Sequence, residues 1–244
     1  MLVLIPLMIT VLTLAGPGAA AAPANGALGN LVTSVFGENT QTIDIVLLLT
    51  ILTLAPSILI MLTGFTRIII VLAFIRNAMG MQQTPPNQVL IGLALFLTFF
   101  IMRPVLSQVY EAAYLPYRAG EIAQEELIST AMGPIREFML RQIFISDLQF
   151  FTEISGVSAE ELDDIPNSTV IPAFITSEIK RAFQIGFFIY IPFIIVDMVV
   201  ASTLMSMGMM MLPPAMISLP FKVLLFVMID GWQLVIKTLL DGFG

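Results

Sequence analysis

The sequence predicts an all-α membrane protein made of kinked apolar helices, and two observations lead to this fold class. Of its 244 residues, 58% are hydrophobic and only 11% are charged, whereas a soluble domain carries about 25% charged residues. The apolar residues are also collected in segments that approach or exceed the roughly 20 residues that a helix needs to cross a bilayer. The polar stretches between them are too short to build a separate soluble core, so we expect a single membrane unit.

The composition also excludes several classes of function. The formal net charge is −7 and the chain has 10 Lys and Arg residues, which argues against nucleic acid as a partner, because phosphate neutralisation needs clustered basic residues. The chain contains no Cys and no His, and so lacks the commonest general base, the thiol nucleophile and the usual transition-metal ligands. No Walker-type nucleotide motif is present. We therefore expect a protein that is not an enzyme and that binds no cofactor or metal.

The N-terminal residues are predicted to be a targeting segment. An apolar run from Leu2 to Leu14 is too short to span a bilayer, and a cluster of small residues follows it, so residues 1–22 are predicted to form a signal peptide. No Lys or Arg precedes the run, which leaves an uncleaved anchor as the alternative. Residues 23–42 are rich in Gly, Asn, Thr and Ala and are expected to form a flexible exported leader.

Residues 43–110 are predicted to form a first apolar helical hairpin. The apolar stretch from Ile43 to Ile75 is longer than one crossing requires, and Pro56 is expected to break it. A turn follows from Asn77 to Asn87, and a second apolar helix runs from about Val89 past Pro104.

The next region, residues 111–181, holds most of the charged side chains. Its apolar residues recur at helical spacing between Pro134 and Phe151, and an acidic turn is ended by Pro166. We expect an amphipathic acidic helical region in contact with water, on the outer side of the membrane.

Residues 182–244 are predicted to form a second apolar hairpin, with helices from Ala182 to Leu204 and from Ile217 to Leu240. The loop at residues 205–214 ends in Pro213 and Pro214, which force a turn. Four apolar segments after the signal suggest four crossings, but the distribution of Lys and Arg supports that topology poorly.

Three apolar segments each carry one polar edge. At about 100° per residue, the edges are Thr50, Thr53, Ser57 and Gly64 with Arg67 at the margin; Glu178, Ala182, Gly186, Tyr190 and Asp197; and Lys222, Asp230, Gln233 and Lys237. A charge inside a membrane helix costs about 2.5 to 3.5 kcal/mol on insertion scales, so these groups should face protein or water. We expect the edges to meet one another or neighbouring subunits, with Lys222 or Arg67 as the partner of Asp197.

Two other functions fit some of the same polar residues. The charged edges could line an ion pathway in an ion-coupled transporter of small solutes, although such transporters usually hold a richer set of internal acids. Two aspartates, Asp197 and Asp230, suggest an intramembrane aspartyl protease as the other alternative, because two carboxylates that share a proton can activate water. Their sequence surroundings lack the Tyr-Asp and Gly-x-Gly-Asp settings of those enzymes, so a structural pairing is favoured.

The loop after the third apolar segment is unusually rich in methionine: Met205, Met207, Met209, Met210 and Met211. Methionine is unbranched and polarizable, so a flexible methionine loop can close around objects of varying shape. The loop therefore suggests a seal, and the alternative is that these side chains fill gaps between helices.

Four stretches resemble the FliP/SctR family of type III secretion export gates: Leu54–Arg67, Thr84–Phe100, Ile191–Pro214 and Leu219–Trp232. The resemblance extends from Ile43 to Leu240. The third stretch, with its loop MSMGMMMLPP, is long and unusual. The predicted signal peptide favours the flagellar branch over the injectisome branch.

The resemblance implies a pore-forming subunit that conducts unfolded flagellar proteins across the bacterial inner membrane, within the flagellar basal body. It implies a homo-oligomer, pentameric and helically arranged, together with FliQ and FliR and next to FlhB and FlhA. It also implies that the hairpins assemble largely on the periplasmic side, which disfavours four simple crossings. By the same resemblance, Met209, Met210 and Met211 form a pore gasket, and the charges of Arg67, Glu178, Asp197 and Lys222 hold helices or subunits together.

Overall fold

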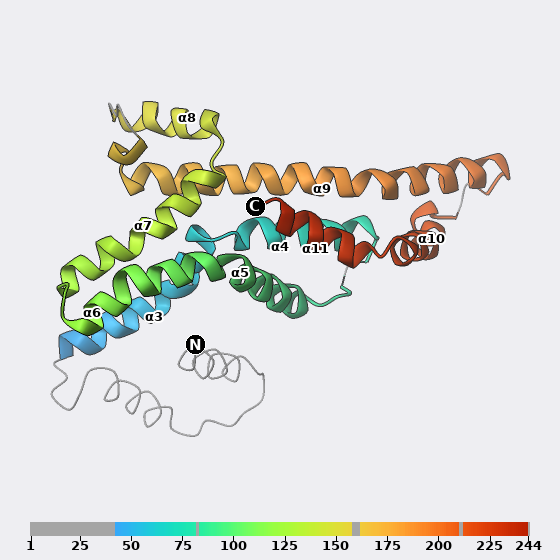
Figure 1. Cartoon of the computed structure of the whole chain (residues 1–244). Helices are drawn as coiled ribbons and strands as arrows, with labels where there is room; N and C mark the ends of the chain where they lie inside the picture. The colour runs from blue at the N-terminus through green and yellow to red at the C-terminus, as the bar shows by residue number, and fades with distance from the viewer. Residues whose placement is uncertain (1–41, 82, 158–161, 210–211, 244) are drawn as a thin grey trace, which may run out of the picture. The chain divides into compact units, whose positions relative to one another are not determined.

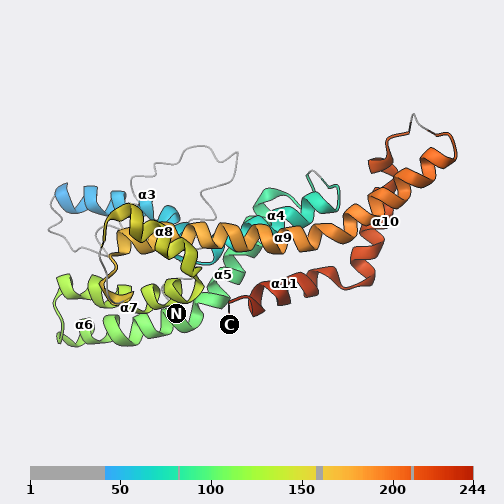
Figure 2. The same cartoon turned by 90° about the horizontal axis from the view of Figure 1, so that it is seen from above.

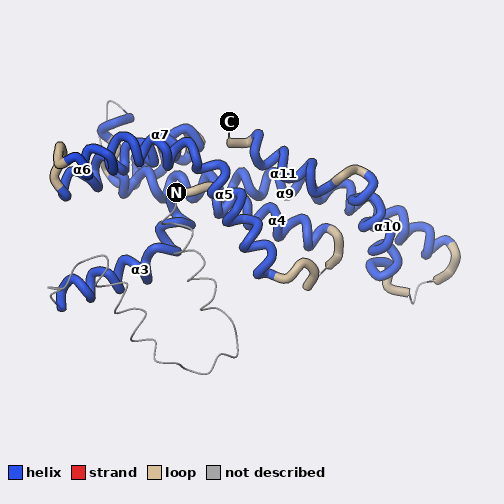
Figure 3. The backbone as a smooth tube through the Cα atoms, turned by 60° about the horizontal axis from the view of Figure 1, so that its bottom comes forward, coloured by secondary structure: helices blue, strands red, loops and turns tan. Residues whose placement is uncertain are grey.

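The computed structural model describes residues 42–81, 83–157, 162–209 and 212–243, and these contain helices and loops but no strand (Figure 3). The predicted signal peptide and nearly all of the predicted leader lie outside the described residues. The chain divides into two compact units, Met1–Pro56 and Ser57–Gly244. The core described below lies within the second unit.

The first apolar stretch is broken at Thr63 and Gly64, not at Pro56. Helix α3 spans Thr42–Leu62 and helix α4 spans Phe65–Ala78, and the chain bends by 74° between Leu52–Leu62 and Phe65–Ala78. The prediction for Pro56 was wrong because a proline removes only one hydrogen bond, whereas a helix end must satisfy several carbonyls. Hydroxyl groups do so here: Thr63 donates to the carbonyl of Leu59, and Thr66 donates to that of Ile60 over 3.0 Å.

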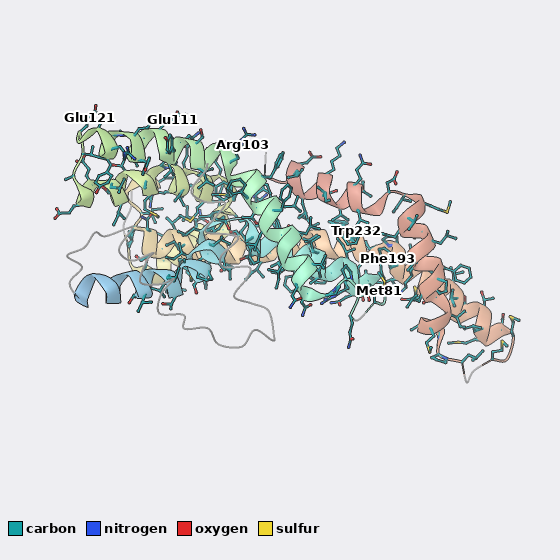
Figure 4. All side chains as sticks on the ribbon, turned by 90° about the horizontal axis from the view of Figure 1, so that it is seen from below. Met81, Arg103, Glu111, Glu121, Phe193 and Trp232 are labelled. Carbon is teal, nitrogen blue, oxygen red and sulfur yellow. The ribbon has the colours of Figure 1, made fainter. Side chains whose placement is uncertain are left out.

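The expected boundary at residues 110 and 111 falls inside a continuous helical stretch. Helix α5 spans Asn87–Val109 and passes through a π-helical turn, Tyr110–Tyr114, into helix α6, Leu115–Ala119. Arg103, Glu111 and Glu121 lie along the outer side of this stretch and its end (Figure 4).

The acidic region contains helices α7, Gln124–Gln142, and α8, Ile145–Ser155, followed by a short 3₁₀ turn, Leu162–Asp164. Helix α9 then spans Asn167–Ser206, a single helix of 40 residues. The expected boundary at residues 181 and 182 therefore lies in the middle of a helix. The part of α9 expected to face water and the part expected to be apolar therefore belong to one helix, with no linker between them.

The last apolar segment is also two helices. Helix α10 spans Pro214–Met228, helix α11 spans Gly231–Asp241, and a bend of 63° separates them. Asp230 lies at the bend with φ 49°, a left-handed conformation that a continuous α-helix cannot contain. The expected uninterrupted helix from Ile217 to Leu240 was therefore wrong.

Two clusters of buried apolar side chains form the core of the second unit. The first packs α4 against α5, α9, α10 and α11, and α4 lies beside α9 in both Figure 1 and Figure 2. The second packs α5, α7 and α9 together. Gly186 of α9 allows the close approach of α4, because a Cβ there would lie 2.7 Å from the ring of Phe74.

Several helices can span a membrane. The stretches Asn87–Ala119 and Asn167–Ser206 are long and apolar enough, and the two bent pairs pass the same test when each pair is taken together. The described elements are all helical, so the fold class of an all-α membrane protein is confirmed.

Candidate functional site: buried ion pairs and a methionine loop

A buried ion pair joins α4 to α9. Arg67 and Glu178 both have fully buried side chains, and two guanidinium nitrogens bind the two carboxylate oxygens, with Nε 3.1 Å from Oε2 and Nη2 against Oε1. This two-point geometry is the arrangement that compensates best for removing both charges from water.

Two further groups complete the coordination of Arg67. Its Nη2 donates to Oε1 of Gln142 over 2.9 Å, and its Nη1 donates to the backbone carbonyl of Gly242 over 2.7 Å. Neither partner was predicted from the sequence. A polar glutamine within the apolar spacing of α7 was the available signal for Gln142. Nothing in the sequence pointed to Gly242.

A second ion pair joins α9 to α10. Lys222 Nζ lies 2.6 Å from Oδ2 of Asp197, and Ser218 donates to Oδ1 over 2.6 Å. The Lys222 side chain is 7% exposed and that of Asp197 is 39% exposed. Of the two predicted partners for Asp197, the structure selects Lys222, because Arg67 is already enclosed by Glu178, Gln142 and Gly242.

A third polar cluster, which the sequence analysis missed, joins α8 to α9. Lys180 forms an ion pair with the buried carboxylate of Asp147, and Ser177 donates to the other carboxylate oxygen over 2.8 Å. Ser177 also accepts a hydrogen bond from the backbone N–H of Phe144 over 3.0 Å. The sequence did contain a signal for Asp147, because this residue lies in the first turn of α8, where a carboxylate is favoured.

The polar edge predicted for residues 222–237 does not exist as one surface. The bend at Asp230 separates Lys222 from Gln233 and Lys237, and the latter two side chains are exposed. A helical arc computed across a break in the helix has no geometric meaning. Asp230 lies at this bend, whereas Asp197 lies in α9 and is bonded to Ser218 and Lys222.

The methionine loop closes the hairpin of α9 and α10, at the end away from α7 and α8 (Figures 1 and 2). Gly208 turns the chain with φ 74°, and the backbone N–H of Met209 donates to the carbonyl of Leu204 over 3.0 Å. Met205, Met207 and Met209 are 61%, 67% and 43% exposed, so they fill no gap between the helices of this chain. Met210 and Met211 lie outside the described residues.

Comparison with known proteins identifies the family. The sequence model of the FliP family matches residues 48–239, which include most of α3 and nearly all of the elements that follow. The chain belongs to the FliP family. The resemblance noted in the sequence is thereby confirmed.

Relatives within the FliP family are similar over most of their length. Flagellar biosynthetic protein FliP of Bacillus subtilis (strain 168) is 54% identical over 216 residues, covering 88% of this chain and 98% of the relative. The protein of the same name from Pectobacterium carotovorum subsp. carotovorum is 53% identical, covering 84% of this chain and 80% of the relative. That of Aquifex aeolicus (strain VF5) is 48% identical, covering 85% and 88%. These names give no support to the small-solute transporter, and they state no catalytic activity.

Proposed function

We propose that this protein is a subunit of the flagellar protein export apparatus and contributes to a pore for unfolded flagellar proteins in the bacterial inner membrane. The observation that carries the proposal is the match to flagellar biosynthetic proteins, which for the Bacillus subtilis protein covers 98% of the relative's length. The flagellar assignment, and not the injectisome one, follows from the same relatives.

The exposed surface of the second unit supports an assembled state. Large apolar side chains cover the outer face of α9 and α10, among them Phe187, Phe188, Met198, Phe221 and Met228, which are 54% to 75% exposed. Single exposed apolar residues are normal, but many large apolar side chains exposed along two neighbouring helices indicate a membrane or protein contact. We infer that several copies, five by family expectation, assemble with FliQ and FliR, near FlhB and FlhA, largely on the periplasmic side.

The hydrogen bonding of the two buried or half-buried carboxylates, Glu178 and Asp197, favours a protein-conducting pore over an ion-coupled transporter. Both oxygens of Glu178 and both oxygens of Asp197 accept hydrogen bonds within the chain. Carboxylates held in this way are suited to fixing helices in place, whereas ion coupling needs acids that exchange partners. We therefore assign Arg67, Glu178, Asp197 and Lys222 to the positioning of helices, and the contacts between copies to the apolar faces.

We assign the seal of the pore to Met209, Met210 and Met211. Replacing all three by alanine should raise the leakage of small solutes across the membrane, because alanine cannot fill the space between opposing copies. Ile128, Ile145 and Ile154 are 70%, 76% and 68% exposed on α7 and α8, outside the faces assigned to contacts between copies. Their triple alanine variant removes a similar amount of exposed apolar side chain, so it is the control and should leave leakage unchanged.

Two measurements make this test decisive. Purification in mild detergent should give a large complex with other small membrane proteins, for both triple variants as for the parent chain. A chain that purifies as a monomer or dimer and transports a solute after reconstitution would overturn the export function. Unchanged leakage in fully assembled Met209, Met210 and Met211 variants would remove the seal while leaving the export function intact.

A further inference from the structure

The ring of Phe243 lies at the junction of the two apolar clusters. It packs against both clusters of buried apolar side chains. It stacks with the ring of Phe138 of α7, with centroids 6.3 Å apart and planes inclined by 16°. The guanidinium of Arg67 lies over the same ring, with its Cζ 3.8 Å from the ring centroid. A cation held against an aromatic face away from water is stabilised by the ring.

The backbone of the same segment is bonded to two helices. The carbonyl of Gly242 accepts from Arg67 Nη1 of α4 over 2.7 Å, and the carbonyl of Phe243 accepts from Gln142 Nε2 of α7 over 3.4 Å. The segment therefore covers the Arg67–Glu178 pair. Its two carbonyl groups, which lie past the end of α11 and would otherwise lack partners, accept hydrogen bonds from Arg67 and Gln142.

At Gly64, the bend between α3 and α4 leaves room for the ring of Phe243 only because this residue has no side chain. The dihedrals of Gly64 are φ −70° and ψ 5°, which any L-residue can adopt. Its backbone does not require glycine. A Cβ at this position, however, would overlap the ring of Phe243. Two residues at opposite ends of the folded chain therefore share one space.

The partners of Arg67 also lie in a definite order along the chain. Gln142, Glu178 and Gly242 follow Arg67 by 75, 111 and 175 residues. The carbonyl of Gly242 and the ring that covers the ion pair can be supplied only after α11 has been synthesised. Both Gly242 and Phe243 lie beyond the residues that match the family.

We propose that Gly242 and Phe243 form a clasp that closes last, seals the Arg67–Glu178 pair from water and fixes the bend at Thr63 and Gly64. With the clasp open, Arg67 keeps its carboxylate but gains access to water, and the end of α11 is released from α4 and α7. The clasp thus makes the packing of the early helices depend on completion of the last one.

A double-mutant cycle in the full chain, isolated in its native assembly, tests the shared space. Gly64→Ala should lower the midpoint of thermal unfolding, because the added methyl group displaces the Phe243 ring. In a Phe243→Ala background the same Gly64→Ala change should have almost no effect. Gly92→Ala is the matched control, since nothing lies within 4 Å of a Cβ at that helical glycine. Equal effects of Gly64→Ala in both backgrounds would overturn the clasp. If Phe243→Ala fails to fold, Phe243→Leu serves in the same cycle, and an additive result again overturns it.

A reporter thiol tests the seal. The chain has no Cys, so a single cysteine reports alone. Ala173 and Ala78 are both fully buried, but Ala173 adjoins Phe174, which contacts Phe138 and through it Phe243. Phe243→Ala, and equally a chain that stops after Asp241, should speed maleimide labelling of Ala173→Cys at least about tenfold, as for a locally opened site. Ala78→Cys should label at the parent rate. Parent-like protection of Ala173→Cys in either chain contradicts the proposal.

Discussion

Arg67 donates hydrogen bonds to three residues from a fully buried position. A buried pair of charges is stable only while both members remain, because each one alone would be left in a medium that solvates it poorly. We infer that the pair with Glu178 contributes more to the uniqueness of the packing than to its net stability. Its contribution becomes visible when one partner is removed.

We expect Arg67→Met to lower the free energy of unfolding by about 3–5 kcal/mol, as for other broken buried pairs. The double variant Arg67→Met with Glu178→Met should recover at least half of this loss, because no unpaired charge remains. Denaturant unfolding in mild detergent measures both. Arg141→Met is the control: its partner Glu137 is one turn away, the two side chains are 60% and 64% exposed, and the expected cost is only about 0.3–0.5 kcal/mol. A double variant as unstable as the single would contradict this account.

At the scale of helices, the bends decide how the apolar segments are arranged. The bend between α10 and α11 is packed: the ring of Phe226 lies over the backbone of Gly231. The same ring contacts that of Trp232 edge to face, with centroids 5.3 Å apart. The ring of Phe226 also lies against that of Phe193 of α9, with centroids 6.3 Å apart, and Phe193 and Trp232 are labelled in Figure 4. This bend requires one residue in the left-handed conformation, and Asp230 adopts that conformation with φ 49°.

The conformation of Asp230 predicts a specific order of stabilities. Asp230→Gly should leave the free energy of unfolding unchanged or raise it by up to about 1 kcal/mol, because glycine adopts positive φ freely. Asp230→Val should lower it by about 1–2 kcal/mol, since a branched side chain clashes in that region. Thermal unfolding checks both, with Asp241→Val in the last turn of α11 as the control for lost charge. Equal costs for valine at the two positions would show that the backbone at Asp230 is unstrained.

At the scale of the whole molecule, the second unit presents water-facing and apolar surfaces along one continuous helix. Helix α8 and the first part of α9 carry the Asp147–Lys180 pair, whereas the second part of α9 exposes apolar side chains. The described helices do not bury these side chains, so lipid or neighbouring subunits must cover them.

Two single cysteines test this division in intact cells. Val199 of α9 and Ile154 of α8 are 59% and 68% exposed, and both are aliphatic. A polar, membrane-impermeant maleimide that reaches the periplasm should label Ile154→Cys at least about tenfold faster than Val199→Cys, because a thiol in apolar surroundings forms little thiolate. Similar rates at the two positions would contradict both the membrane contact of α9 and the periplasmic location of α8.

Much of this organisation could be predicted from the sequence because it depends on local pattern. Apolar run length predicted helices that can cross a membrane, Pro213 and Pro214 predicted the turn before α10, and helical spacing placed Asp197 and Lys222 on inward faces. The family was recognisable from four stretches of sequence. The same reasoning failed at Pro56, because it weighs the loss of one hydrogen bond but not the hydroxyl groups that satisfy a helix end.

The sequence by itself determined the helical class, the membrane environment, the methionine loop and the residues that would have to be paired. Only the tertiary structure decided that Asp197 pairs with Lys222, that the chain bends at Gly64 and Asp230, and that Phe243 covers Arg67. The reason is physical: hydrophobic periodicity acts over a few residues along the chain. The fit of a ring against a glycine, or of a guanidinium between a carboxylate and a carbonyl 175 residues away, exists only when distant segments share one space.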